Sequence, residues 1–233
     1  MSQARQYEMK DSGIEWIGKV PKGWYAIRLK TLFISCDGGN WGDDPQHNEN
    51  DRICLRIADF DFDKGRFKDI PTDHLTTRNY TDVHIQKLLL RPGDLLIEKS
   101  GGGEKTPVGR GVLFDKSYDA LYANFMARLR VNAQIANAEF ISYFWRSLYY
   151  MTVVIPFIKQ TTGIQNLDLS ALLERVKTFL PPLPEQQAIA AYLDEKCAAI
   201  DGIIAEKESL IAKLETYKKS LIFETVTGKR RVC

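Results

Sequence analysis

The chain has 233 residues, of which 44% are hydrophobic and 27% charged, and its formal net charge is +2. This composition excludes a disordered chain, and the near-neutral charge means that any nucleic-acid binding must come from local groups of side chains. No apolar run approaches the roughly 20 residues that span a bilayer, and the cysteines form no CxxC pair. We therefore expect a cytoplasmic protein with no membrane insertion, zinc site or disulfide framework.

The first 180 residues alternate short β-like runs with polar, turn-rich loops, which predicts an α+β domain spanning residues 1–180. Strands are expected at residues 53–57, 94–97, 111–114 and 125–131, where apolar runs have Gly, Pro or Asp borders. Residues 138–150 repeat apolar side chains at spacings of three and four, which predicts a core helix. The fold class is therefore a globular domain of mixed short strands and helices.

Several loops of this domain carry side chains suited to reading DNA. In the major groove, Arg and Lys pair with guanine, and Asn and Gln pair with adenine. Any one of these loops taken alone is more simply a solvated turn, so the hypothesis depends on their combination. The candidate DNA-binding residues are Asn40, Trp41, Arg78 and Asn79, then Lys99, Ser100, Gly101, Gly102, Lys105 and Thr106 of a glycine loop, and finally Lys159, Gln160, Thr161, Gln165 and Asn166.

Residues 181–233, which begin with a proline cluster, are almost free of helix breakers. Their apolar positions alternate steps of four and three, which is the heptad spacing of a coiled-coil seam. We expect a helix from Glu185 to Thr227, with Pro184 in its first turn and Gly228 after its end. The alternative is that the helix bends at Gly202 and buries its stripe on the chain's own core. The candidate dimer and partner positions are Leu193, Cys197, Ile200, Ile204, Ile211, Leu214 and Leu221.

Catalytic motifs are missing from the sequence. A methyltransferase needs a cofactor loop and an Asp/Asn-Pro-Pro-aromatic or Pro-Cys segment, and neither is present. The run from Gly101 to Thr106 departs from a nucleotide-binding P-loop because Glu104 separates Gly103 from Lys105. The three histidines lie in separate loops without a placed nucleophile. We therefore predict no catalytic residue, no metal ligand and no cofactor in this chain.

Four blocks of the sequence resemble the specificity subunits of Type I restriction-modification systems. They are residues 11–24 (DSGIEWIGKVPKGW), 91–97 (RPGDLLI), 162–167 (TGIQNL) and 180–190 (LPPLPEQQAIA). The resemblance implies a target recognition domain that reads one half of a bipartite double-stranded DNA site, followed by a long helix that docks methyltransferase subunits. In that family the methyltransferase modifies adenine at N6 with S-adenosylmethionine, and an ATP-driven restriction subunit can join the complex.

The chain departs from the usual family pattern, which has two recognition domains and two long helices. Here we find one of each and no internal repeat. We expect a half-subunit whose copies form a homodimer through antiparallel helices and read an inverted-repeat target. A truncated chain is the alternative to a natural half-subunit. Two further alternatives are a coiled-coil adaptor without a DNA role and an enzyme with an unrecognised site.

Overall fold

The computed structural model describes residues 8–161 and 163–232 and divides into two compact units, Met1–Gln187 and Ala188–Cys233. Thr162, which belongs to one of the four sequence blocks, lies outside the described residues. The first unit is α+β and the second is helical, so the predicted fold class is confirmed. Among the described residues, no helix combines the length and the apolar content needed to cross a membrane.

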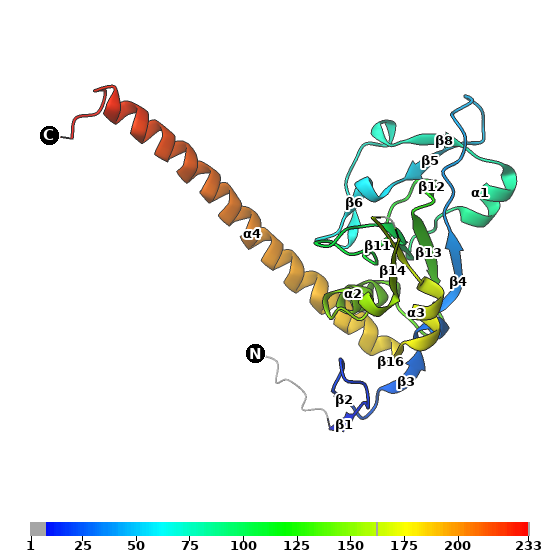
Figure 1. The fold of residues 1–233 in the computed structure, drawn as a ribbon. Coiled ribbons are helices and arrows are strands. Elements are labelled where there is room, and N and C mark those ends of the chain that lie inside the picture. Colours follow the sequence, from blue (N-terminus) through cyan, green and yellow to red (C-terminus); the bar gives the residue numbers. More distant parts are fainter. Residues whose placement is uncertain (1–7, 162, 233) are drawn as a thin grey trace. The chain divides into compact units, whose positions relative to one another are not determined.

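A six-stranded sheet forms the centre of the first unit (Figure 1). Its strand β9 (Asp94–Glu98) is buried along its whole length and pairs antiparallel with β13 (Met126–Val131) and with β11 (Gly111–Leu113). Strand β4 (Phe33–Gly38) is antiparallel to β13, whereas β7 (Arg66–Phe67) is parallel to β11. The strands predicted at 94–97, 111–114 and 125–131 are confirmed as β9, β11 and β13. In spatial order, the strands are β4 (Phe33–Gly38), β13 (Met126–Val131), β9 (Asp94–Glu98), β11 (Gly111–Leu113), β7 (Arg66–Phe67) and β6 (Phe60–Asp61).

Helix α2 (Ala138–Tyr150) packs on β9 and β11 of this sheet, and it has the predicted bounds. Asn137 caps its start, because the side chain accepts a hydrogen bond from the N–H of Phe140. Trp145 is fully buried and donates its indole N–H to the carbonyl of Gly109. Gly111 lies so close to Trp145 that an added Cβ would be 2.7 Å from the ring, so only glycine fits under the helix.

Four smaller sheets and several short helices complete the first unit. The sheets are β12 (Ala120–Tyr122), β5 (Asp51–Leu55) and β8 (Thr77–Asn79); β10 (Ser100–Gly101), β15 (Ile164–Leu167) and β14 (Ile158–Thr161); β16 (Lys177–Leu180) and β3 (Tyr25–Arg28); and β1 (Met9–Asp11) and β2 (Lys19–Pro21). The helices are α1 (Asp82–Leu88), α3 (Leu169–Arg175) and the 3-10 turns η1 (Leu29–Leu32), η2 (Ile57–Asp59), η3 (Thr72–His74) and η4 (Ile155–Phe157).

The strand predicted at 53–57 is wrong in its second half. Strand β5 ends at Leu55, and the 3-10 turn η2 follows. The cause is Asp59, whose carboxylate accepts hydrogen bonds from the backbone N–H of Arg56 at 2.7 Å and from the Arg56 guanidinium at 3.2 Å. This local side-chain contact turns the chain out of the sheet, which apolar periodicity does not reveal.

Helix α4 (Leu183–Val226) accounts for the heptad segment, and helical structure continues through Gly202 (Figure 1). A bend at that glycine is therefore absent. Pro184 lies in the first turn as predicted, and Gly228 follows the end with a φ of 73°. The predicted division between residues 180 and 181 lies just before the start of this helix.

The first turn of α4 is built into the first unit by Gln186, which is fully buried. Its side-chain amide donates to the carbonyls of Ile135 and Pro181, both at 2.9 Å, and its oxygen accepts from the N–H of Asn137 at 2.8 Å. The neighbouring Glu185 accepts a hydrogen bond from the Trp24 indole. Residues of the first and last sequence blocks are therefore in direct contact.

Candidate nucleic-acid interface

One end of the central sheet brings together loops from separate parts of the chain. In the antiparallel register, Gly38 at the end of β4 lies opposite Ala127, and Glu98 at the end of β9 lies opposite Met126. The loops that leave β4 and β9 therefore emerge beside the turn that enters β13. We call this region the sheet end.

Backbone hydrogen bonds join the glycine loop to the turn before β13. The carbonyl of Phe125 accepts from the N–H groups of Lys99 at 2.8 Å and Ser100 at 3.1 Å. Further along, Gly103 and Thr106 exchange two backbone hydrogen bonds, of 3.1 and 3.2 Å, which close the tip of the loop around Lys105. The lysine is thus carried on an ordered turn.

The residues predicted as a loop from Lys159 to Asn166 form instead the hairpin β14–β15, which pairs with the glycine loop. Ser100 lies opposite Asn166 and Gly101 opposite Gln165, and the Ser100 hydroxyl is 2.7 Å from the Asn166 side-chain oxygen. The oxygen of Gln165 accepts from the N–H of Val108. Two of the three predicted groups are therefore joined in one small sheet.

Burial separates positioning residues from exposed ones in these two segments. Ser100 and Gln165 are buried, and their hydrogen bonds hold the hairpin to the loop, so neither presents its side chain to a ligand. The side chain of Thr161 lies outside the described residues. Lys99 and Gly101 are half-buried, while the exposed candidates are Gly102, Lys105, Thr106, Lys159, Gln160 and Asn166.

The loop after β4 is pressed against the turn before β13 at Gly39. An added Cβ there would lie 2.2 Å from the carbonyl oxygen of Ala123 and 2.5 Å from that of Tyr122, so no other residue fits without moving the backbone. Asn40 donates its N–H to the Tyr122 carbonyl. Its side-chain oxygen accepts from the N–H of Gly42 at 2.6 Å, which fixes the loop that carries Trp41.

The candidates Arg78 and Asn79, on β8, support the Trp41 loop. The Arg78 guanidinium stacks on the Trp41 ring at 4.9 Å and pairs with Asp44 at 2.6 Å. Asn79 donates to the carboxylate of Asp51, and this hydrogen bond is the main cause that holds the pKa of Asp51 below its ordinary value. Arg78 and Asn79 are therefore engaged within the protein, whereas the Trp41 ring is 40% exposed.

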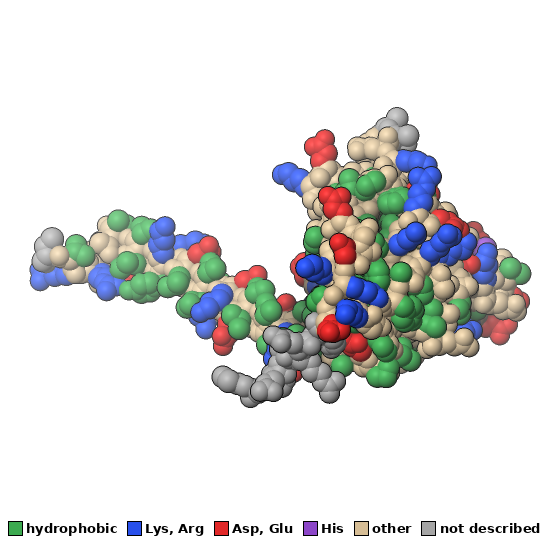
Figure 2. All heavy atoms as spheres, turned by 90° about the horizontal axis from the view of Figure 1, so that it is seen from below, with side chains coloured by type: hydrophobic (Ala, Val, Ile, Leu, Met, Phe, Trp, Pro, Cys, Tyr) green, Lys and Arg blue, Asp and Glu red, His purple; other side chains and the backbone are tan. Residues whose placement is uncertain are grey.

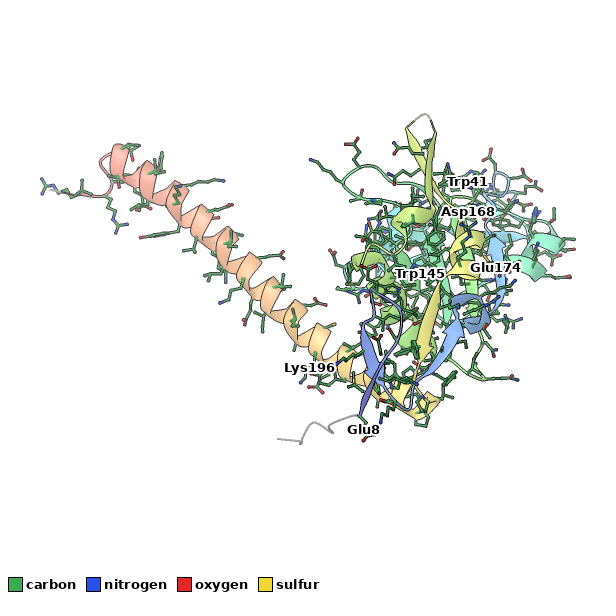
Figure 3. The ribbon with its side chains drawn as sticks, turned by 60° about the horizontal axis from the view of Figure 1, so that its bottom comes forward. Glu8, Trp41, Trp145, Asp168, Glu174 and Lys196 are labelled. Atoms are coloured by element: carbon green, nitrogen blue, oxygen red, sulfur yellow. The ribbon has the colours of Figure 1, made fainter. Side chains whose placement is uncertain are left out.

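A shallow cavity of about 500 Å³ lies beside Trp41, and sequence reasoning missed most of its lining. Phe125 is 49% exposed there, although it was expected as the first residue of a strand. Trp41 and Glu8 lie toward opposite ends of the unit (Figure 3). The lining residues are Trp41, Arg56, Ile57, Ala58, Ala123, Asn124 and Phe125.

Charge at the sheet end is mixed. Lys159 pairs with Asp168 at 2.7 Å, and Arg78 pairs with Asp44 at 2.6 Å. No group of three or more His, Cys, Asp or Glu side chains is placed to hold a metal ion in the part of the chain that the structure describes. The sheet end presents aromatic, amide and lysine side chains on a rigid frame. Side chains of these types bind nucleic acids.

Comparison with known proteins confirms the resemblance. Residues 69–215 match a family model described as the Type I restriction modification DNA specificity domain. The chain is 24% identical over 229 residues to the Type I restriction enzyme MjaVIII specificity subunit of Methanocaldococcus jannaschii, which covers 97% of this chain and 51% of the relative. It is 26% identical over 214 residues to the EcoKI specificity subunit of Escherichia coli, with 91% and 44% covered. The chain thus spans about half the length of these relatives.

Solved structures share the fold. A chain in a structure described as the basis of complex assembly and conformational transition of the type I R-M system matches with a TM-score of 0.57 and 22% identity, over 93% of this chain and 48% of that one. The HsdS subunit from Thermoanaerobacter tengcongensis matches with a TM-score of 0.51 and 22% identity, over 93% and 47%. At this identity the likeness supports the fold alone.

Proposed function

Because the chain belongs to the Type I restriction-modification DNA specificity family, we propose that it is a non-catalytic specificity subunit that recognises double-stranded DNA by sequence. The sheet end is the observation that carries this proposal. Three segments far apart in the sequence meet there, namely the loops after β4 and β9 and the hairpin β14–β15, and they carry the exposed residues Trp41, Lys105 and Asn166. Rigid loops of this kind hold side chains in the geometry that base reading requires.

In this proposal, residues 1–180 recognise DNA and residues 181–233 bind protein partners. The partner is a Type I modification subunit that carries S-adenosylmethionine and methylates adenine at N6, and a restriction subunit can join the same complex. The support is the chemistry of α4. Apolar side chains recur along it, and those of Ile200, Ile204, Ile211 and Leu214 are between 49% and 56% exposed. Figure 2 shows such hydrophobic side chains at intervals along the helix.

The proposal includes a homodimer through antiparallel α4 helices. A seam in heptad spacing is stabilised when a second helix covers it, and an antiparallel pair has a two-fold axis. Two identical recognition domains then read the two halves of a bipartite target, so the target is an inverted repeat.

The test is to map methylated adenines in a genome that carries the modification subunit, with and without this chain. We expect one bipartite motif to be methylated only when the chain is present. If the methylation pattern does not depend on the chain, the proposal is wrong. The alternative, a coiled-coil adaptor without a DNA role, predicts no retention on duplex DNA, whereas a specificity subunit is retained and released by added salt.

A further inference from the structure

A second cavity, of about 270 Å³, lies between the glycine loop, the turn from β6 to β7 and the end of α2. Lys105 and Thr106 line it from the loop, and Arg146 and Tyr150 line it from the helix. We call it the Arg146 pocket. Arg146 belongs to none of the segments that the sequence marked for DNA.

The Arg146 side chain is held in place without a carboxylate. Its guanidinium donates to the backbone carbonyl of Asp63 at 2.7 Å and lies 3.5 Å from the Tyr150 hydroxyl. Its Nε is buried and has no hydrogen-bond partner among the described residues. Gly65, with a φ of 67°, makes room for it, since an added Cβ would lie 2.9 Å from the Arg146 Cδ. The guanidinium also lies 5.5 Å from the Tyr143 ring centre and 6.0 Å from that of Tyr150. It is therefore positioned, and no ion pair to a carboxylate neutralises it among the described residues.

The other arginine of the pocket behaves differently. Arg110 makes a bidentate ion pair with the buried carboxylate of Glu98, at 2.8 and 3.1 Å, and stacks on the Phe62 ring at 3.5 Å. Its charge is thus neutralised, and it serves the fold. Arg146 differs from Arg110 because it makes no ion pair with a carboxylate within the described residues.

After the Arg110–Glu98 pair is set aside, the net charge of the side chains that line the pocket suits a singly charged anion. Lys105 is exposed on its closed turn, and Arg146 faces the same cavity. The exposed carboxylate of Asp63 also lines it, so two cations against one carboxylate leave one positive charge. The Thr106 hydroxyl adds a hydrogen-bond donor. A guanidinium, an ammonium and a hydroxyl around one space are the groups that bind phosphate oxygens.

We propose that the Arg146 pocket binds a phosphodiester of the DNA backbone, with Lys105 and Arg146 as its charge partners. The inference rests on the proposed function and extends the DNA-contacting surface from the glycine loop onto α2. Such a contact fixes where the duplex lies against the domain but carries no sequence information.

The experiment measures binding of the full chain to a mixed-sequence duplex of about 30 base pairs over a range of salt, because each phosphate contact adds about 0.9 to the slope of log K against log salt. We expect Arg146→Gln or Lys105→Gln to lower that slope by up to about 0.9, and the double variant to lower it by about 0.9 in total, because both side chains contact the same phosphodiester. Arg146→Lys keeps the charge and should restore the slope. Relative affinities for different sequences should not change.

Arg91→Gln is the matched control, because Arg91 is exposed just before the start of β9, at the opposite end of that strand from Glu98. Its slope should equal that of the wild type. If Arg146→Gln keeps the wild-type slope while the wild type binds duplex, Arg146 only closes the β6–β7 turn and the proposal is overturned. If the wild type itself does not bind duplex, the proposed function fails first. Inorganic phosphate is titrated in parallel, and its binding at Arg146 with an unchanged duplex slope would mark a free-anion site and reject the proposal.

Discussion

Asp37 and Arg128 form an ion pair between neighbouring strands, just inside the sheet end. They lie opposite each other on β4 and β13, with 2.6 Å between Oδ2 and Nη2, and their side chains are 16% and 3% exposed. Replacing Asp37 with Asn leaves the buried guanidinium without its counter-ion, which destabilises proteins strongly. We expect Asp37→Asn to lower the free energy of unfolding by about 3 kcal/mol, measured by denaturant titration at neutral pH.

The same pair predicts how stability depends on pH. Burial raises the pKa of Asp37, but the hydrogen bond from Arg128 and the charges of Arg128 and Lys87 outweigh it, so the pKa lies below its ordinary value. A carboxyl whose folded pKa is lowered stabilises the fold above its unfolded pKa, and that contribution is lost as the pH falls through the folded pKa. The wild type should therefore lose more stability on acidification than Asp37→Asn. Parallel losses would show that the pair does not contribute in this way.

Gly39 supports the candidate interface through its lack of a side chain. A Cβ at this position would collide with the backbone oxygens of Ala123 and Tyr122. We expect Gly39→Ala to displace the Trp41 loop, to lower the free energy of unfolding by about 1–3 kcal/mol, and to weaken duplex binding. Gly23→Ala is the control, because nothing lies within 4 Å of an added Cβ there. Equal effects of the two substitutions on unfolding and on DNA retention would contradict this role.

At the scale of elements, the start of α4 depends on one side chain. Gln186 satisfies the N–H of Asn137 and the carbonyls of Ile135 and Pro181. Gln186→Ala leaves these buried backbone groups without partners, and each such group costs about 1–3 kcal/mol. We expect a loss of about 2 kcal/mol or more in denaturant unfolding, whereas the exposed neighbour Gln187 should tolerate Ala within about 0.5 kcal/mol. A similar small change in both variants would reject the role of Gln186.

The α4 seam predicts a self-associating helix. A single helix cannot cover its own apolar stripe, and Ile204 and Ile211 are 49% and 56% exposed. Two carboxylates placed at these positions would have to be desolvated between paired helices. We expect Ile204→Asp with Ile211→Asp to convert a dimer to a monomer in sedimentation. The control is Ala205→Asp with Ala212→Asp, which adds the same charges one residue along the helix and outside the seam, and should leave the dimer intact.

For the whole molecule, the sequence predicts the parts that repeat locally. Helix α2 and the strands β9, β11 and β13 follow from apolar periodicity, and α4 follows from its heptads, Pro184 and Gly228. What periodicity cannot give is which distant segments pair. The contact of Ser100 with Asn166 joins residues 66 positions apart, and it turns two predicted loops into one small sheet.

The candidate site was predicted only in part, because the sequence shows residue types but not which distant segments pack together. Lys105, Thr106 and Trp41 were found by residue type and are exposed as expected. Gln165 was chosen for its amide and is buried, because its alternation within β15 turns the side chain inward. Phe125 and Arg146 were missed, since one stands in an apolar run and the other on a core helix, and neither has a loop signal. Their exposure depends on tertiary packing that no local pattern encodes.

The proposed dimer makes a prediction about the DNA itself. A two-fold axis through paired α4 helices relates the two recognition domains, so the same side chains must face both half-sites. The methylated motif should then be an inverted repeat with an unread spacer, with half-site centres roughly 34 Å apart, about one turn of the duplex. Sequencing of methylated adenines gives the motif directly. Changing one half-site should weaken binding as much as the equivalent change in the other, because both meet identical readers. Two unrelated half-sites would contradict the homodimer while leaving DNA recognition by a single domain intact, since a second, different recognition domain would then have to supply the other half.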